Sequence, residues 1–303
     1  MIYDIIVIGG GPAGLTAALY AKRANKSVLI IEKAAYGGQI TYSPKVENIP
    51  GFIAVSGNEF AEKLVEQVVE QGAELEFCEV LSVEDGDVKK VVTDGGVFEG
   101  KAIIIATGAK HRRLNLEGEE KFIGDGISFC AVCDGAFYKD KVVGVVGGGN
   151  SALQEALLLS DLCKKVYVIQ NLDKLTGENK LQEQLMAKAN VEIILSTLVK
   201  GYLGSDRFEG VDVISASGEE RSISLDGLFV AIGLIPQNGI FKNLLTLNDY
   251  GYAESGEDCK AKAEGVFVAG DCRSKKIRQV ATAMADGAVS ALAACDYVDN
   301  LKI

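Results

Sequence analysis

The strongest constraint on the fold is an internal repeat, because Ile5–Lys33 and Val143–Asn171 superimpose without a gap. Each copy reads as an apolar strand, a triple glycine, a helix with apolar positions three and four residues apart, and a second apolar strand. This order is that of the βαβ unit, in which a glycine turn joins a parallel strand to a helix. Two copies therefore predict an α/β protein with two Rossmann-like, dinucleotide-binding domains.

The segments between and after the repeats predict how the two domains are connected. Lys101–Arg113 reads as a strand followed by a turn, and Asp226–Pro236 is its counterpart in the second half. Glu264–Cys272 is a further strand, and an apolar helix follows it to Cys295. We therefore expect residues 114–242 to form a second domain that is inserted into a first domain made of residues 1–113 and 243–303, with the two crossings as hinges.

The glycines of the two turns have separate roles. The first glycine of the pattern, Gly9 or Gly147, allows a tight turn. The second, Gly11 or Gly149, lets the backbone approach a pyrophosphate. The third position, Gly14 or Ala152, lets helix and strand pack closely. A GxGxxG pattern alone is weak, since glycine turns also serve packing, but here the flanking strands and helix are in register.

The repeat also allows the ends of the second strands to be compared. Glu32 ends that strand in the first copy, where an acid accepts hydrogen bonds from a ribose. The equivalent residue of the second copy is Gln170, and Asn171 and Leu172 follow it. The first copy is thus predicted to bind an adenosine, whereas the second has kept its glycine turn and has neither the acid for a ribose nor an arginine for a 2′-phosphate.

Charge and composition exclude several classes of partner. The formal net charge of −11 argues against nucleic acid and anionic membranes. There is no run of 18 apolar residues, and a strand pattern begins near Met1, so we expect neither a membrane span nor a signal peptide. Seven cysteines, mostly scattered, do not resemble a secreted disulfide framework, and they indicate a cytoplasmic protein.

The one close cysteine pair, Cys130 and Cys133, predicts a redox centre. A CxxC pair can close into a reducible disulfide whose reactivity depends on thiolate stabilisation. Half of a zinc site is the first alternative, but His111 is the only histidine and there is no second CxxC, so no metal is expected. Two buried core cysteines are the second alternative, and the Asp134-Gly135 turn that follows fits an exposed site better.

The motifs GGGPAG, GGQI, VENIPGF, ATGA, CAVCDG and GDCR…RQVATA, in this order over essentially the whole chain, resemble those of low-molecular-weight thioredoxin reductases. The resemblance implies bound FAD, a homodimer, and an NAD(P)-type second domain that carries the CxxC. Carried over position by position, it implies that FAD is bound by Gly9, Gly11, Pro12, Ala13, Gly14, Glu32, Lys33, Gly38, Gln39, Asn48, Ala106, Thr107, Gly108, Gly270, Asp271, Arg278, Gln279, Val280 and Ala281.

The same resemblance implies the catalytic residues Cys130, Cys133 and Asp134. Reduced flavin would reduce the disulfide through Cys133, Cys130 would attack the disulfide of thioredoxin, and Asp134 would donate and accept protons. The alternative for Asp134 is a simple turn or helix-capping carboxylate. Facing the flavin and facing a protein partner require different geometries, so a domain rotation is expected from the family.

The electron donor is where the chain departs from the family pattern. The family clamps the 2′-phosphate of NADPH with a His-Arg-Arg-x-x-x-Arg run, and the aligned residues are Gln170, Asn171, Leu172 and Thr176. Amide and aliphatic side chains cannot replace bidentate arginines, and Lys174 and Lys180 have the wrong spacing. The sequence thus disfavours NADPH, and it favours the branch of the family that is reduced by ferredoxin.

The sequence leaves other electron donors and other functions open. The intact GGGNSA is either retained scaffolding or a working pyrophosphate turn, so an NADH- or NADPH-dependent thioredoxin reductase remains the main alternative. A flavin disulfide reductase for another small protein disulfide and a flavoprotein with a silent disulfide are the others. Ferredoxins are acidic, so docking needs a positive patch; Arg273, Lys275, Lys276 and Arg278, or Lys110, Arg112 and Arg113, are the candidates, with ordinary solvated loops as the alternative.

Overall fold

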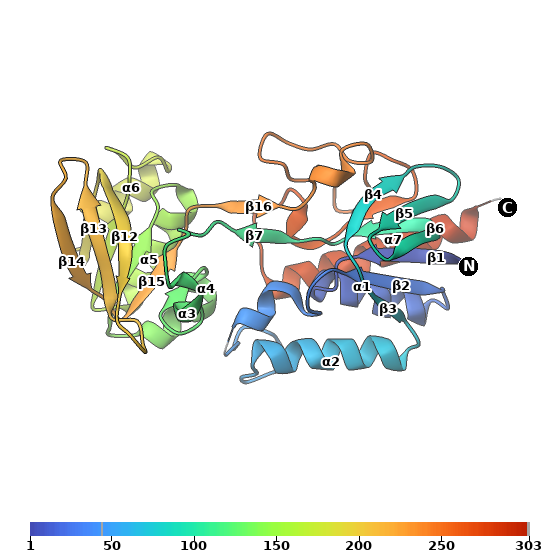
Figure 1. Cartoon of the computed structure of the whole chain (residues 1–303), viewed down its shortest axis with the longest axis horizontal. Coiled ribbons are helices and arrows are strands. Elements are labelled where there is room, and N and C mark those ends of the chain that lie inside the picture. The colour runs from blue at the N-terminus through green and yellow to red at the C-terminus, as the bar shows by residue number, and fades with distance from the viewer. Residues whose placement is uncertain (44, 302–303) are drawn as a thin grey trace. The chain divides into compact units, whose positions relative to one another are not determined.

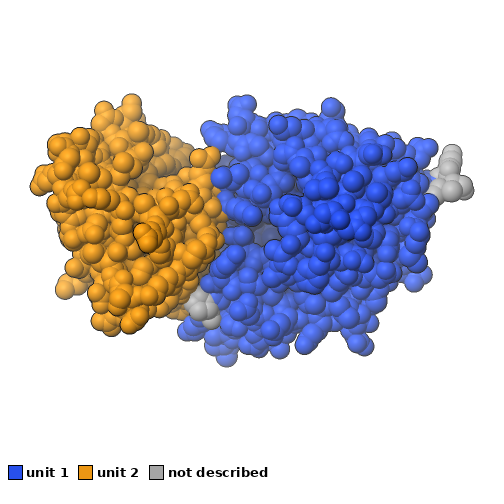
Figure 2. All heavy atoms as spheres, in the orientation of Figure 1, with its two compact units in different colours: residues 1–110, 235–303 blue, residues 111–234 orange. Residues whose placement is uncertain are grey.

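The computed structural model describes residues 1–43 and 45–301, and the chain divides into two compact units (Figures 1 and 2). Unit 1 comprises residues 1–110 and 235–303, and unit 2 comprises residues 111–234. The chain therefore leaves unit 1 after Lys110 and re-enters it at Ile235, earlier at both crossings than the predicted boundaries at 113 and 242. The second difference has a packing reason, because the fully buried Phe241 belongs to a hydrophobic cluster of unit 1.

Unit 1 is built on a seven-stranded sheet with the order β3-β2-β1-β6-β5-β4, and β17 also pairs with β6. The pairs around β1 and β2 and the β17–β6 pair are parallel, whereas β4–β5 and β5–β6 are antiparallel. The long strand β6 holds β5 along its first half and β17 along its second. The strands are β1 (Ile2–Ile8), β2 (Val28–Glu32), β3 (Glu74–Phe77), β4 (Val80–Glu84), β5 (Lys89–Thr93), β6 (Gly96–Ile105) and β17 (Val266–Val268).

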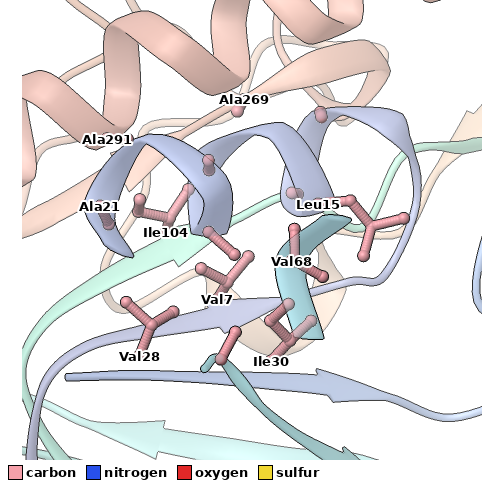
Figure 3. Close-up of a cluster of buried hydrophobic side chains, with 14 of the residues drawn as sticks. Val7, Leu15, Ala21, Val28, Ile30, Val68, Ile104, Ala269 and Ala291 are labelled. Atoms are coloured by element: carbon pink, nitrogen blue, oxygen red, sulfur yellow. The ribbon is translucent and has the colours of Figure 1, made fainter. Parts of the chain in front are cut away.

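Small residues let two helices of unit 1 pack closely. A Cβ on Gly287 of α7 would lie 2.2 Å from the carbonyl oxygen of Ala13 in α1, so only glycine fits there. Apolar residues of α1, α2, α7 and the sheet form one core, which includes Val7, Leu15 and Ile104 (Figure 3). The helices are α1 (Pro12–Arg23), α2 (Gly57–Glu70) and α7 (Val280–Asn300), with 3₁₀ turns η1 (Gly38–Tyr42), η3 (Gly239–Phe241) and η4 (Gly270–Cys272).

Unit 2 contains a five-stranded parallel sheet with the order β11-β10-β9-β15-β8 and a three-stranded antiparallel sheet with the order β12-β13-β14. The strands are β8 (Ile127–Ser128), β9 (Val142–Val146), β10 (Lys165–Ile169), β11 (Val191–Ile194), β12 (Thr197–Leu203), β13 (Gly210–Ser215), β14 (Glu220–Ser224) and β15 (Gly227–Val230). The helices are α3 (Glu119–Phe122), α4 (Ala131–Asp134), α5 (Asn150–Leu162) and α6 (Asn179–Met186), with the 3₁₀ turn η2 (Gly135–Tyr138).

The repeat predicted from the sequence is present in both units, as β1–α1–β2 and as β9–α5–β10. The prediction of an α/β protein with two Rossmann-like domains is thereby confirmed. The crossing segments β7 (Ala109–His111) and β16 (Leu234–Pro236) pair with each other as a two-stranded sheet. Within residues 1–43 and 45–301, no helix is both long enough and apolar enough to cross a membrane.

Candidate functional site

The CxxC pair forms a disulfide between Cys130 and Cys133, whose Cα atoms are 5.3 Å apart. Cys130 caps the single helical turn α4, which contains Cys133. The N–H of Cys133 donates to the Sγ of Cys130 at 3.2 Å, and the N–H of Asp134 donates to the carbonyl of Cys130 at 3.0 Å. Both cysteines are half-buried, and Val132 between them has 60% of its surface exposed. The disulfide therefore lies where a protein partner can reach the turn that holds it.

The carboxyl group of Asp134 lies beside the buried Ser128, next to the disulfide turn. The hydroxyl of Ser128 donates to Asp134 Oδ2 at 2.6 Å and accepts from the N–H of Cys130 at 3.1 Å. The other oxygen, Oδ1, is buried and has no hydrogen-bond partner among the described residues. Burial raises the pKa of Asp134, against the bond from Ser128, which lowers it. Such a group can hold a proton and release it beside the disulfide.

A second acid with a buried oxygen, Glu155, is a site residue that the sequence motifs did not indicate. It lies on α5, its Oε2 is buried without a partner among the described residues, and burial raises its pKa to about 7. A signal was available, because the repeat aligns Glu155 with Ala17, which is fully buried on α1. An acid at a position that is core in the other copy is a candidate for a buried functional carboxyl.

The first glycine turn is shaped to receive an anion. Gly9 has a φ of +112°, and a Cβ there would lie 2.3 Å from the carbonyl oxygen of Ala106. A Cβ on Gly14 would lie only 1.9 Å from the carbonyl oxygen of Gly9, whereas a Cβ on Gly11 would meet no atom closer than 4.0 Å. Helix α1 begins after Gly11 with no side chain capping it, so its first N–H groups are available to a phosphate.

The carboxylate of Glu32 is held beside this turn at the end of β2. Its Oε2 accepts from the N–H of Gly10 at 2.8 Å, and its Oε1 accepts from the N–H of Ala34 at 2.9 Å. Gly38 also approaches the turn, since a Cβ there would lie 3.3 Å from the Cα of Gly11. Lys33, in contrast, forms a surface salt bridge with Glu79 at 2.9 Å.

The other group of predicted FAD residues meets where β17 ends and α7 begins. The Asn48 side chain donates to Gln279 Oε1 at 3.2 Å, and the Arg278 guanidinium lies 4.1 Å from the centroid of the Tyr252 ring. Asp271 Oδ1 is buried without a hydrogen-bond partner among the described residues, and burial raises the pKa of Asp271. A buried acceptor without a donor fits a ligand hydroxyl such as those of a flavin side chain.

The remaining predicted FAD residues flank these two groups in unit 1. Ala106, Thr107 and Gly108 follow β6, whose parallel neighbours β1 and β17 lead into Gly9 and Gly270. Because the carboxyl ends of parallel strands share one sheet edge, these residues lie at the same edge. Pro12 and Ala13 form the first turn of α1, Gln39 is exposed on η1, and Val280 and Ala281 begin α7. The glycine turn, the carboxylate of Glu32 and the buried carboxyl group of Asp271 together fit an FAD molecule.

A buried ion cluster corrects one expectation about a positive docking patch. Asp286 of α7 accepts from Arg273 at 2.8 Å and from Lys275 at 2.8 Å, and it also accepts from the N–H of Gly270 at 3.1 Å. Side-chain exposure is 13% for Arg273 and 10% for Lys275. These two cations are therefore internal ion-pair partners rather than free docking charges, whereas Lys276 is exposed.

The second glycine turn differs from the first at the position of the acid. Gln170 is only 4% exposed, and its Nε2 donates to the carbonyl of Lys174 at 3.2 Å. It packs so tightly over the turn that a Cβ on Gly148 would lie 2.5 Å from Gln170 Nε2. Asn171, Leu172 and Thr176, at the positions where the family has its arginines, are exposed and carry no charge, and the exposed Asp173 and Lys174 stand between them. The positions that clamp a 2′-phosphate in the family thus present amide, apolar and hydroxyl groups.

Comparisons with known proteins identify the family. The family model described as "Pyridine nucleotide-disulphide oxidoreductase" matches residues 3–287. A thioredoxin reductase of Listeria monocytogenes is 40% identical over 99% of this chain and 95% of that protein. A "34.2 kDa protein in rubredoxin operon" of Clostridium pasteurianum is 39% identical over 97% of both chains.

A solved structure agrees with these relatives in fold. The crystal structure of thioredoxin reductase from Streptococcus pyogenes is 39% identical, covers 99% of both chains and has a TM-score of 0.94. The chain therefore belongs to the low-molecular-weight thioredoxin reductase family of flavin disulfide oxidoreductases.

Proposed function

We propose that this protein reduces the disulfide of thioredoxin through its own Cys130–Cys133 disulfide. The observation that carries the proposal is the formed disulfide on an accessible turn beside a buried, partly unpartnered carboxyl group. FAD, which the family implies, would supply electrons to the disulfide when bound. Gly9, Gly11 and the start of α1 would hold its pyrophosphate, Glu32 its ribose, and Asp271 a hydroxyl of its ribityl chain.

The residues of the disulfide turn divide the chemistry among them. Reduction of the disulfide takes up two electrons and two protons and yields two thiols. The Cys130 thiolate then attacks the thioredoxin disulfide and forms a mixed disulfide, which Cys133 resolves, so that the pair is oxidised again and thioredoxin leaves as a dithiol. Asp134 receives and returns the proton at these steps, because its buried carboxyl group is held next to the turn.

For the electron donor we propose a reduced ferredoxin. Gln170 is buried in the place of the ribose-binding acid. Asn171, Leu172 and Thr176 stand where the family has the arginines that clamp a 2′-phosphate. Docking would use Lys276 or the exposed Lys110 and Arg112.

A nicotinamide nucleotide is the second candidate donor, and one observation favours it. Helix α5 begins at Asn150 after Gly149 with no side-chain cap, so its N–H groups remain available to a pyrophosphate. Relatives at 40% identity are named thioredoxin reductases without a stated donor. Reduction of another small protein disulfide is the alternative substrate, and a homodimeric, cytoplasmic enzyme is proposed on the family resemblance.

The substrate proposal is tested by reducing the FAD-loaded protein with dithionite under anaerobic conditions, removing the excess, and adding oxidised thioredoxin. We expect up to two thioredoxin dithiols to form per fully reduced protein, because the reduced FAD and the Cys130/Cys133 dithiol each hold two electrons, and we expect Cys130→Ser and Cys133→Ser to abolish their formation. Cys78→Ala is the matched control, since Cys78 is buried in unit 1 outside the pair. Thioredoxin that stays oxidised with the wild-type protein contradicts the proposal.

A further inference from the structure

Glu155 lies on the face of α5 that packs against the disulfide segment. A Cβ on Gly135, directly after the CxxC-Asp sequence, would lie 3.3 Å from Leu159 Cδ2 and 3.5 Å from Leu162 Cδ1. Residues four and seven positions apart share one face of a helix. Glu155 is four residues before Leu159 and seven before Leu162, so its carboxyl group points to the same segment one turn earlier, at α4.

The surroundings of this carboxyl group are those of a proton-holding site. The backbone of Ala131, between the two cysteines, gives a hydrogen bond to the Glu155 carboxyl group. Its second oxygen is buried and unpartnered among the described residues, as is one oxygen of Asp134. Neither acid forms a salt bridge with any residue in the described part of the chain. The disulfide turn thus has two carboxyl groups beside it that each bury one oxygen and lack a cationic partner among the described residues.

The charged groups on the elements around α5 are engaged elsewhere. On β10, Lys165 pairs with Glu192 at 2.9 Å, and before α6 the Glu178 carboxylate accepts from the Nδ2 of Asn150 at 3.1 Å. On η2, burial and the charge of Asp134 raise the pKa of Tyr138 to about 12, so this phenol stays neutral. Asp134 on α4 is therefore the ionisable group that acts on Glu155.

The pKa of each carboxyl group is raised, and the causes differ. Burial first, and then the charge of Asp134, raise the pKa of Glu155 to about 7, whereas burial is what raises the pKa of Asp134. The charge of Asp134 thus favours the protonated form of Glu155. Glu155 can therefore both hold and release a proton near neutral pH.

We propose that Glu155 is the proton reservoir of the disulfide site and acts through Asp134. When reduction turns a cysteine sulfur into a thiolate, the proton passes from Glu155 to Asp134 and from Asp134 to the sulfur, and solvent returns a proton to Glu155. On oxidation by a substrate disulfide the proton runs back the same way. The role rests on the proposed function of Cys130 and Cys133 as the reducible pair.

The first test is infrared spectroscopy of the FAD-loaded, oxidised protein over a pH titration. The wild-type protein should show a protonated-carboxyl C=O band that disappears with a midpoint near pH 7, and Glu155→Gln should lack it. Glu183→Gln is the matched control, because Glu183 is an exposed acid on the neighbouring helix α6. Asp134→Asn should keep the band and lower its midpoint, since the charge that raises it is gone.

The second test is the rate at which dithiothreitol reduces the disulfide of the same proteins between pH 5 and 9. The ratio of variant to wild-type rate cancels the ionisation of dithiothreitol. For Glu155→Gln we expect a rate about tenfold lower at pH 7, less than the ~10²-fold lost with a directly acting general acid. Glu155→Asp should restore both the band and the rate, and it serves in place of Glu155→Gln if that variant does not fold.

A C=O band that persists in Glu155→Gln, or a rate ratio of one across the pH range, overturns the proposal. Neither measurement uses thioredoxin or a biological electron donor. A protein that shows the band and the rate effect but leaves thioredoxin oxidised therefore contradicts only the proposed substrate. A protein that reduces thioredoxin but has no such band contradicts only the role of Glu155.

Discussion

At the scale of single residues, Asp286 organises the turn that carries Asp271. Burial alone would raise the pKa of Asp286, but its bonds with Arg273 and Lys275 hold that pKa below its usual value. The same carboxylate accepts from the N–H of Gly270, next to Asp271, whose Oδ1 has no hydrogen-bond partner among the described residues. Asp286 thus pairs with two largely buried cations and fixes the backbone at the predicted flavin site, although it need not touch the cofactor.

Asp286→Asn should lower the free energy of unfolding by about 3 kcal/mol, because it leaves two buried cations without a counter-charge. Urea unfolding at pH 7 measures this loss. Asp299→Asn is the control, because the Asp299 side chain is 65% exposed and its salt bridge with Lys26 contributes less than about 1 kcal/mol. Because the pKa of Asp286 is lower in the folded than in the unfolded protein, its ionised form stabilises the fold at pH values above the unfolded-state pKa of about 3.9. This stabilisation is lost as the pH falls through the folded-state pKa. The difference from wild type should therefore shrink in acid, and equal stability at pH 7 would refute the role of Asp286.

At the scale of elements, the two βαβ units differ at one packing position. Gly14 of α1 cannot carry a Cβ without a clash of 1.9 Å with the Gly9 carbonyl oxygen. Its counterpart Ala152 on α5 does carry one, and that methyl group is fully buried. Helix α1 therefore lies closer to its glycine turn, as is required where the helix start must approach a bound pyrophosphate.

Gly14→Ala should destabilise unit 1 by about 1–3 kcal/mol through overpacking and should weaken the retention of FAD. Ala152→Gly is the reciprocal control, and it should cost about 1 kcal/mol through helix propensity while FAD stays bound. The absorbance of flavin that remains after gel filtration, together with urea unfolding, checks both. Full FAD retention in Gly14→Ala would show that close packing of α1 is not needed for the site.

Some of the observed helices and strands could be predicted from the sequence, and others could not. The repeat gave both βαβ units because hydrophobic period and glycine position are local signals. The three-stranded sheet β12–β13–β14 was not predicted, and neither was the burial of Lys275 against Asp286, since contacts between distant segments leave no periodic trace. Glu155 was missed because its meaning depends on which helix face meets the disulfide turn.

At the scale of the whole molecule, each unit carries one part of the proposed chemistry. Unit 1 holds the glycine turn, Glu32 and Asp271, and unit 2 holds the disulfide with Asp134 and Glu155. Unit 2 also keeps a second glycine turn, with a buried Gln170 in the place of an acid. The family relationship therefore accounts for flavin and disulfide, whereas the proposed donor depends on whether this second turn binds a nucleotide.

The most direct test is anaerobic stopped-flow at the flavin absorbance band, in which the oxidised FAD-loaded protein is mixed in turn with reduced ferredoxin, NADPH and NADH. We expect ferredoxin to bleach the flavin rapidly and both nicotinamide nucleotides to bleach it slowly or not at all. Rapid bleaching by micromolar NADPH or NADH, with no response to ferredoxin, would contradict the proposed donor.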